Sequence, residues 1–226
     1  MTQLALPLQL QDHAVFESFW PAQNQPLVAY LLELAEGAQD RGCWIRGKEA
    51  TGKSHLLQAV CARLGDRSIY VPLADLSQLG PGILDGLASR HCVCLDDFHE
   101  VAGDEKWELA LFGLFNQLSD NGGLMLVSSL SAPRDSGIEL ADLRSRMSLL
   151  TVFQLQALSE QDTTMALQLR ARHRGLDLPA DTASYLMSRT RRDMGSLYAL
   201  LDRLDAEALR TQRRLTIPFV RTVIDS

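Results

Sequence analysis

The sequence lacks the features that mark secreted and membrane proteins. Its 226 residues contain no apolar run of about 18 residues, which argues against a membrane-spanning helix. The amino terminus has no basic segment followed by a long apolar core, so we expect no signal peptide. There are only four cysteines, and they do not have the spacing of metal ligands. These absences predict a cytoplasmic protein with reduced thiols and no membrane partner.

Positive charge is also in short supply, because 22 Lys and Arg face 28 Asp and Glu, for a net charge of −6. This balance does not favour general attraction to nucleic acid or to anionic membranes. The charge is unevenly distributed, since residues 159–226 contain eleven arginines, no lysine and nine acids. This basic part could face phosphates or an acidic partner, or it could be an ordinary solvated helical surface.

The strongest motif is a complete phosphate-binding loop, G-K-E-A-T-G-K-S, of the form G-x-x-x-x-G-K-S/T. Its two glycines allow the backbone N–H groups to form a nest around an anion. Lys53 places a positive charge beside the outer phosphates, and the Ser54 hydroxyl is a ligand for Mg²⁺. A short apolar strand precedes the loop and a helix follows it, which is the context that the motif requires. The predicted nucleotide-binding residues of this segment are Gly47, Lys48, Glu49, Ala50, Thr51, Gly52, Lys53, Ser54 and His55.

Strands and helices alternate over the first two thirds of the chain. Apolar runs predict strands at 43–46, 68–73, 91–95, 124–129 and 149–155. Helical spacing predicts helices at 24–38, 55–64, 81–88, 106–119 and 140–147. Several strands are apolar throughout, which is typical of a parallel sheet covered on both faces.

The pattern changes after Leu158 to helices alone, and Ser159 with Asp162 predicts a capping box for the first of them. We therefore expect three parts. Residues 1–12 form a tail, residues 13–158 form an α/β nucleotide-binding domain with a five-stranded parallel sheet, and residues 159–226 form a small all-helical domain.

Paired carboxylates, Asp96 and Asp97, end the strand predicted at 91–95. We expect this strand to lie beside the one that precedes the phosphate loop, which would bring both carboxylates to the nucleotide. Asp96 would then hold Mg²⁺ through water, together with Ser54, and Asp97 would polarise an attacking water. The alternative is a pair of solvated carboxylates at the end of a strand.

Two further pairs of polar residues flank the last two strands. Ser128 and Ser129 end the strand at 124–129 and would supply a polar group near the terminal phosphate, although serine is common at such junctions. Arg144 and Arg146 precede the strand at 149–155. An arginine there can reach a neighbouring subunit's triphosphate and stabilise the transition state of hydrolysis. The alternative is a pair of surface arginines.

In this order the motifs resemble those of the AAA+ ATPases, and within them the DnaA branch and its short Hda-type regulators. The segments at 16–21, 170–179 and 213–220 (F-E-S-F-W-P, R-A-R-H-R-G-L-D-L-P and R-R-L-T-I-P-F-V) carry the resemblance to the Hda type. It implies a AAA+ P-loop core with a helical lid, ADP (or ATP) with Mg²⁺ as the ligand, and Phe16 beside the adenine. It also implies a trans arginine finger, Arg146, that triggers ATP hydrolysis on DnaA and so inhibits initiation of DNA replication.

The tail resembles the hexapeptide with which Hda-type proteins bind the bacterial sliding clamp, the beta subunit of DNA polymerase III. Leu4, Leu6 and Leu8 would lie along one side of an extended segment, and Gln3 would offer its amide to backbone groups at the rim of a groove. The alternative is a tail that packs on its own domain. The implied partners are DnaA, the clamp and, through the clamp, DNA; a homodimer is left open.

Two positions depart from the family pattern. Gly195 stands where the family has an arginine in the third lid helix, and Arg192, or Arg191, could replace it from the preceding turn. Leu130 stands where the initiator has an aspartate after the fourth strand. Both departures favour nucleotide binding with at most weak intrinsic ATPase activity. The alternative function is an autonomous AAA+ ATPase of the helicase-loader type.

Overall fold

The computed structural model describes residues 14–190 and 194–224. Its centre is a five-stranded parallel sheet, as predicted, and each strand overlaps a predicted apolar run. The strands are β1 (Gly42–Arg46), β2 (Ser68–Pro72), β3 (Cys92–Asp96), β4 (Leu124–Ser129) and β5 (Thr151–Gln154).

The order of the strands in the sheet is β2-β3-β4-β1-β5. The prediction that the strand ending at Asp96 lies beside the loop strand is therefore wrong. β4 separates the two, pairing with β1 from Gly42↔Met125 to Arg46↔Ser129 and with β3 from Cys92↔Leu124 onward. Strand order depends on how the helical connections cross the sheet, which the strand sequences do not encode. The carboxyl ends of β1, β3 and β4 still meet at one edge because all pairings are parallel.

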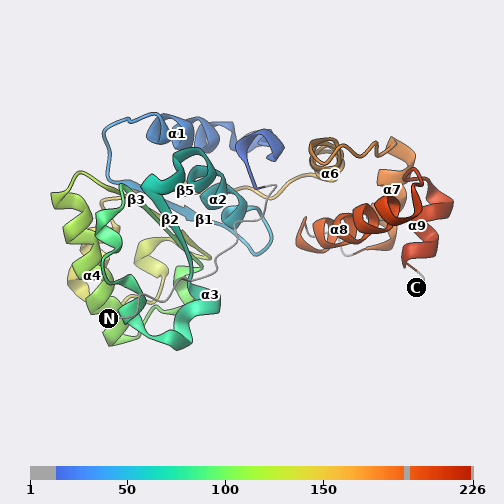
Figure 1. Ribbon diagram of the computed structural model, residues 1–226. Helices are drawn as coiled ribbons and strands as arrows, with labels where there is room; N and C mark the ends of the chain where they lie inside the picture. The colour runs from blue at the N-terminus through green and yellow to red at the C-terminus, as the bar shows by residue number, and fades with distance from the viewer. Residues whose placement is uncertain (1–13, 191–193, 225–226) are drawn as a thin grey trace.

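Helices cover both faces of the sheet (Figure 1). One face carries α1 (Gln25–Ala35) and α2 (Lys53–Leu64), and the other carries α3 (Leu73–Leu76), α4 (Glu105–Asp120) and α5 (Ala141–Met147). Side chains of β1 alternate between the two cores, with Trp44 on the α4 side and Cys43 and Ile45 on the α2 side. This double burial explains why β1, β3 and β4 are largely apolar. All four cysteines are buried and free, as expected.

The prediction of a helix at 81–88 is wrong. Two 3-10 turns, Pro81–Leu84 and Leu87–Ser89, occupy this stretch. Gly86 between them has a φ of 79°, a left-handed conformation that breaks a helix and that glycine adopts at little cost. The region is therefore an irregular connection that leads into β3.

Residues after β5 form a lid of four helices, drawn orange to red in Figure 1. They are α6 (Glu160–His173), α7 (Ala180–Arg189), α8 (Met194–Thr211) and α9 (Ile217–Ile224). They enclose a core of their own, with Leu167, Leu201, Leu204 and Phe219 fully buried. Among the helices of the described ranges, none is long and apolar enough to cross a membrane.

Side chains that precede α1 form hydrogen bonds with the segment that connects the sheet to the lid. The buried amide of Asn24 donates to the carbonyl oxygen of Gln156 at 3.1 Å and accepts the N–H of Gln156 at 2.8 Å. Ser159 caps α6, as predicted, by accepting the N–H of Asp162 at 3.1 Å. The Asp162 carboxylate accepts from the Ser159 hydroxyl and from the Trp20 indole, at 3.0 Å in the latter case. Asp162 therefore ties the start of the lid to the amino-terminal segment.

A buried carboxylate on α4 fixes the start of α5. Glu108 is 1% exposed, and it accepts the N–H groups of Gly103 at 2.8 Å, Glu139 at 3.1 Å and Leu140 at 2.6 Å. Leu140 is the N-cap of α5, the helix that carries Arg146. The position of that helix therefore depends on Glu108.

We expect Glu108→Ala to lower the free energy of unfolding by about 3 kcal/mol, because each buried N–H left without an acceptor costs about 1–3 kcal/mol. Urea denaturation measures the change. Glu105→Ala, at an exposed site on the same helix, is the control and should change stability by less than about 0.5 kcal/mol. Equal effects of the two substitutions would contradict this role of Glu108.

Candidate functional site

The loop between β1 and α2 turns through two residues with left-handed backbones, Ala50 (φ 55°) and Gly52 (φ 102°). A Cβ on Gly52 would lie 2.9 Å from Cε2 of Phe19, and one on Gly47 would lie 3.0 Å from the carbonyl oxygen of Leu155. Both glycines are therefore needed for space, and Gly52 also for its φ. The turn places the amino terminus of α2, with its partial positive charge, at the end of the loop.

Lys53 reaches back into this loop. It is 4% exposed, and its ammonium donates to the carbonyl oxygens of Gly47 at 3.1 Å and Lys48 at 2.9 Å. Burial lowers the pKa of Lys53, and nearby carboxylates, first Asp97, oppose that shift. A buried cation inside a ring of backbone groups has the chemistry to bind a phosphate.

The end of β3 is held by hydroxyl groups. The buried Asp96 carboxylate accepts from the Tyr70 hydroxyl at 2.6 Å and from the Ser128 hydroxyl. Ser128 in turn accepts the N–H of Asp97 at 2.9 Å. Asp97 has a φ of 55°, and burial, followed by the charge of Asp96, raises its pKa. Ser128 thus supports the carboxylates, while the buried Ser129 hydroxyl has no hydrogen-bond partner among the described residues.

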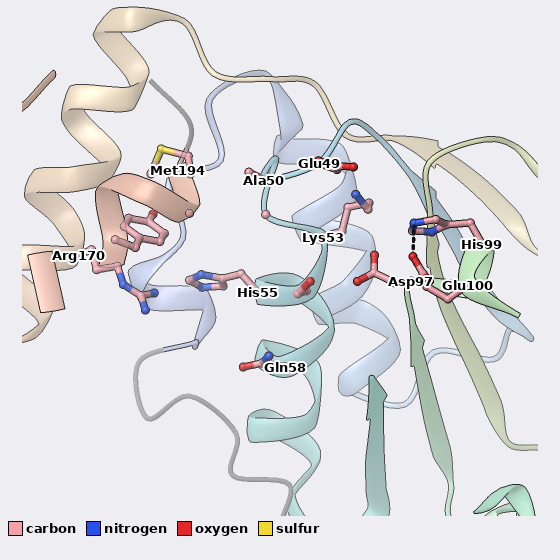
Figure 2. Close-up of a pocket in the computed structure, with 14 residues that line it drawn as sticks. Glu49, Ala50, Lys53, His55, Gln58, Asp97, His99, Glu100, Arg170 and Met194 are labelled. Carbon is pink, nitrogen blue, oxygen red and sulfur yellow. Dashed lines mark ion pairs between the residues drawn. The ribbon is translucent and has the colours of Figure 1, made fainter. Parts of the chain in front are cut away.

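A cleft of about 350 Å³ opens between the phosphate loop and the lid (Figure 2), within the range of small-molecule sites of about 300–1,000 Å³. The core residues that line it are Glu49, Ala50, Gly52, Lys53, Ser54, His55, Gln58, Asp97, His99 and Glu100. The lid residues that line it are Arg170, Met194, Gly195 and Tyr198. The fold thus brings the phosphate loop, Asp97 and the lid around one space.

Several of these residues were not predicted as site residues, and Arg170 is the most informative. It follows Ala166 and Leu167 by one helical turn on the buried face of α6. An arginine on an apolar helix face is the sequence signal that could have found it, because charged side chains are rarely fully buried without a partner or ligand.

His55 is held beside the amino-terminal segment. Its Nε2 lies 2.9 Å from the carbonyl oxygen of Val15, and its ring contacts that of Phe19 at a centroid distance of 5.3 Å. Burial lowers the pKa of His55 to about 4, so the imidazole is neutral near pH 7 and Nε2 donates to Val15. Phe16 packs partly buried against the core around α2, and its place beside the adenine stays a prediction.

Other predicted residues lie elsewhere. Arg146 is on the exposed side of α5, and its guanidinium makes no hydrogen bond or ion pair with a described residue. Arg144, two residues earlier, donates to the carbonyl oxygen of Ile138 at 3.2 Å. The two arginines therefore differ, because Arg144 donates a hydrogen bond within the described chain and Arg146 does not. The predicted tail residues Gln3, Leu4, Leu6 and Leu8, and the lid residues Arg191 and Arg192, lie outside the described residues.

The donor set decides how a metal ion would fit. In the part of the chain that the structure describes, no group of three or more His, Cys, Asp or Glu side chains is arranged to hold a metal. Ser54 and Asp96 alone do not supply a complete set of metal ligands. They fit the usual Mg²⁺ site of nucleotide-binding proteins, where phosphates and water supply most ligands.

Comparison with known proteins gives one family and several related folds. Residues 160–224 match the family described as the Hda lid domain. The chain is similar to domain III of the replication initiation protein DnaA from Thermotoga maritima, with 19% identity, a TM-score of 0.78, and coverage of 96% of this chain and 98% of that chain. AMPPCP-bound DnaA from Aquifex aeolicus has 21% identity and a TM-score of 0.66, over 83% of this chain and 63% of that chain. The RuvB Holliday junction branch migration motor of Thermotoga maritima has 15% identity and a TM-score of 0.62, over 90% and 68%.

The strand order, the phosphate loop after β1 and the helical lid define the fold class, a AAA+-type P-loop core followed by a helical lid. The match to the Hda lid domain concerns residues 160–224, and the whole chain shares its fold with DnaA domain III.

Proposed function

We propose that this protein is an ADP-bound regulator that docks on the DNA-loaded sliding clamp and stimulates ATP hydrolysis by DnaA. In this proposal Arg146 enters the nucleotide site of DnaA and stabilises the charge that develops during hydrolysis. The product is an inactive initiator, so the protein inhibits initiation of chromosomal replication. Clamp docking contributes by raising the local concentration of both partners on DNA.

One observation carries the proposal: a Hda-type lid follows a core whose fold is that of DnaA domain III. Head-to-tail packing of two such cores would set the exposed side of α5 against the partner's nucleotide. The exposed position of Arg146 supports this arrangement, because a finger must leave its own subunit to act.

The proposed ligand of the cleft is ADP, accompanied by Mg²⁺. The phosphate loop and Lys53 would hold its phosphates, and Ser54 and Asp96 would hold the ion. When bound, the nucleotide would bridge the sheet domain and the lid and hold them in one arrangement. Asp97 is available to polarise water, but the chain's glycine at position 195 favours binding over turnover.

The direct test is to measure loss of DnaA-bound ATP in the presence of clamp-loaded DNA, with and without this protein. We expect hydrolysis to accelerate only when protein, clamp and DNA are all present. An unchanged rate with ADP-bound protein would refute the proposed function.

The tail gives a separate prediction. Changing Leu6 and Leu8 together to alanine should abolish pull-down by the clamp while leaving ADP affinity unchanged, because the leucines would fill an apolar groove of the clamp and take no part in nucleotide binding. Changing Gln9 and Gln11 to alanine is the matched control and should leave pull-down intact. Normal pull-down of the leucine variant would refute the tail assignment.

The second candidate is an autonomous AAA+ ATPase of the helicase-loader type. The similarity of fold to the RuvB motor favours it, as does Asp97 at the cleft. A substantial steady-state ATPase with assembly into rings on ATP would support it over the regulator.

A further inference from the structure

A buried arginine of the lid faces the phosphate loop. Arg170 lies in the last turns of α6, is 2% exposed and lines the cleft. Figure 2 shows its guanidinium directed toward His55 on α2. Burial lowers the pKa of Arg170, because removing the charged guanidinium from water costs free energy. Asp202 favours the charged form within the protein, and an anionic ligand in the cleft would favour it further.

The ring of Tyr198 sets the orientation of this guanidinium. Cζ of Arg170 lies 4.2 Å from the centroid of the Tyr198 ring, a stacked cation–π arrangement. Stacking covers one face of the guanidinium, and its N–H groups point outward in its own plane. Tyr198 comes from α8 and also lines the cleft, so two lid helices hold the charge in place.

The other charges around the cleft show why a cation is needed at this position. Gly195 lines the cleft without a side chain, so α8 offers no charge there. Arg174, one turn after Arg170, is engaged in ion pairs with Asp202 and, at 3.8 Å, with Asp205. His55 is neutral near pH 7. Of the described residues that line the cleft, Lys53 and Arg170 are the only lysine and arginine.

Negatively charged side chains outnumber lysine and arginine in the lining of the cleft. Glu49, Asp97 and Glu100 line the same cleft, so its lining has three carboxylates against one lysine and one arginine. The anionic phosphates of a nucleotide would be repelled by this balance if only Lys53 met them. A second cation from the lid would offset the negative charge of the lining. Arg170 lies on the side of the cleft away from Asp97 (Figure 2).

We propose that Arg170 binds a phosphate group of the nucleoside diphosphate in this cleft and takes the part of the lid arginine that is missing at Gly195. The inference rests on the proposed function in assuming that the cleft holds a nucleotide. Arg170 from the lid and Lys53 from the core then hold the same phosphates, so that the ligand joins the two parts of the chain.

The test compares ADP with adenosine, which has the same base and ribose but no phosphate. Equilibrium dialysis gives both dissociation constants for wild type, Arg170→Ala and the control Arg172→Ala, an exposed arginine on the same helix. We expect Arg170→Ala to weaken ADP binding by about 10- to 100-fold and to leave adenosine binding within about twofold, as a lost charged hydrogen bond predicts. Arg172→Ala should change neither.

A second variant guards against loss of structure. Arg170→Ala with Gly195→Arg places a cation in α8, and we expect it to regain ADP affinity relative to Arg170→Ala. Unchanged ADP binding in Arg170→Ala, or an equal loss of ADP and adenosine binding, would overturn the inference while leaving the proposed function standing. Failure of the wild-type protein to bind ADP would overturn both.

Discussion

Arg146→Ala is expected to reduce stimulated hydrolysis of DnaA-bound ATP by about 10³-fold or more, the range over which arginine fingers act. Arg146 is exposed on α5, and the described residues offer its guanidinium no hydrogen bond or ion pair. The substitution therefore removes no hydrogen bond or ion pair within the described fold, and ADP binding, clamp binding and stability should be unchanged. The rate of loss of ATP from DnaA, on clamp-loaded DNA, measures the effect.

Arg144→Ala is the matched control. Its side chain has the same chemistry and lies on the same helix, but it donates to the carbonyl oxygen of Ile138 in its own chain. We expect this variant to retain most of the stimulation. If Arg144→Ala loses stimulation and Arg146→Ala keeps it, the finger has been assigned to the wrong arginine.

Lys53→Ala is expected to weaken ADP binding by about 100-fold or more, because truncating one partner of a buried charged pair costs about 2–5 kcal/mol. Among the described residues, the Lys53 ammonium donates to two backbone carbonyls of the loop, and burial lowers its pKa. The charge is thus held at a cost that phosphate would offset. Isothermal titration calorimetry with ADP measures the change.

Lys106→Ala supplies the comparison for charge alone, since Lys106 is an exposed lysine on α4. It should bind ADP like wild type. Thermal unfolding of the ligand-free Lys53→Ala variant should be close to that of wild type, because no carboxylate of the described residues is ion-paired with Lys53. An ADP affinity within about threefold of wild type would show that the phosphate loop does not bind nucleotide through Lys53.

Much of the fold could be predicted because it depends on local patterns. The apolar runs of β1, β3 and β4 became strands that are buried on both faces. The Ser159 cap begins α6 where its side chain accepts the N–H of Asp162. The helix predicted at 81–88 failed for a local reason too, since Gly86 takes a left-handed φ that apolar spacing does not reveal.

Only the part of the candidate site that lies within one continuous segment could be predicted from the sequence. The loop from Gly47 to Ser54 carries its own turn, donors and cation, so its sequence is sufficient to specify it. Other features involve residues that lie far apart along the chain. They are the strand order, in which β4 separates β3 from β1, and the burial of Arg170 against Tyr198. They follow from how helices pack across the sheet and against one another, and these long-range contacts exist only once the chain has folded.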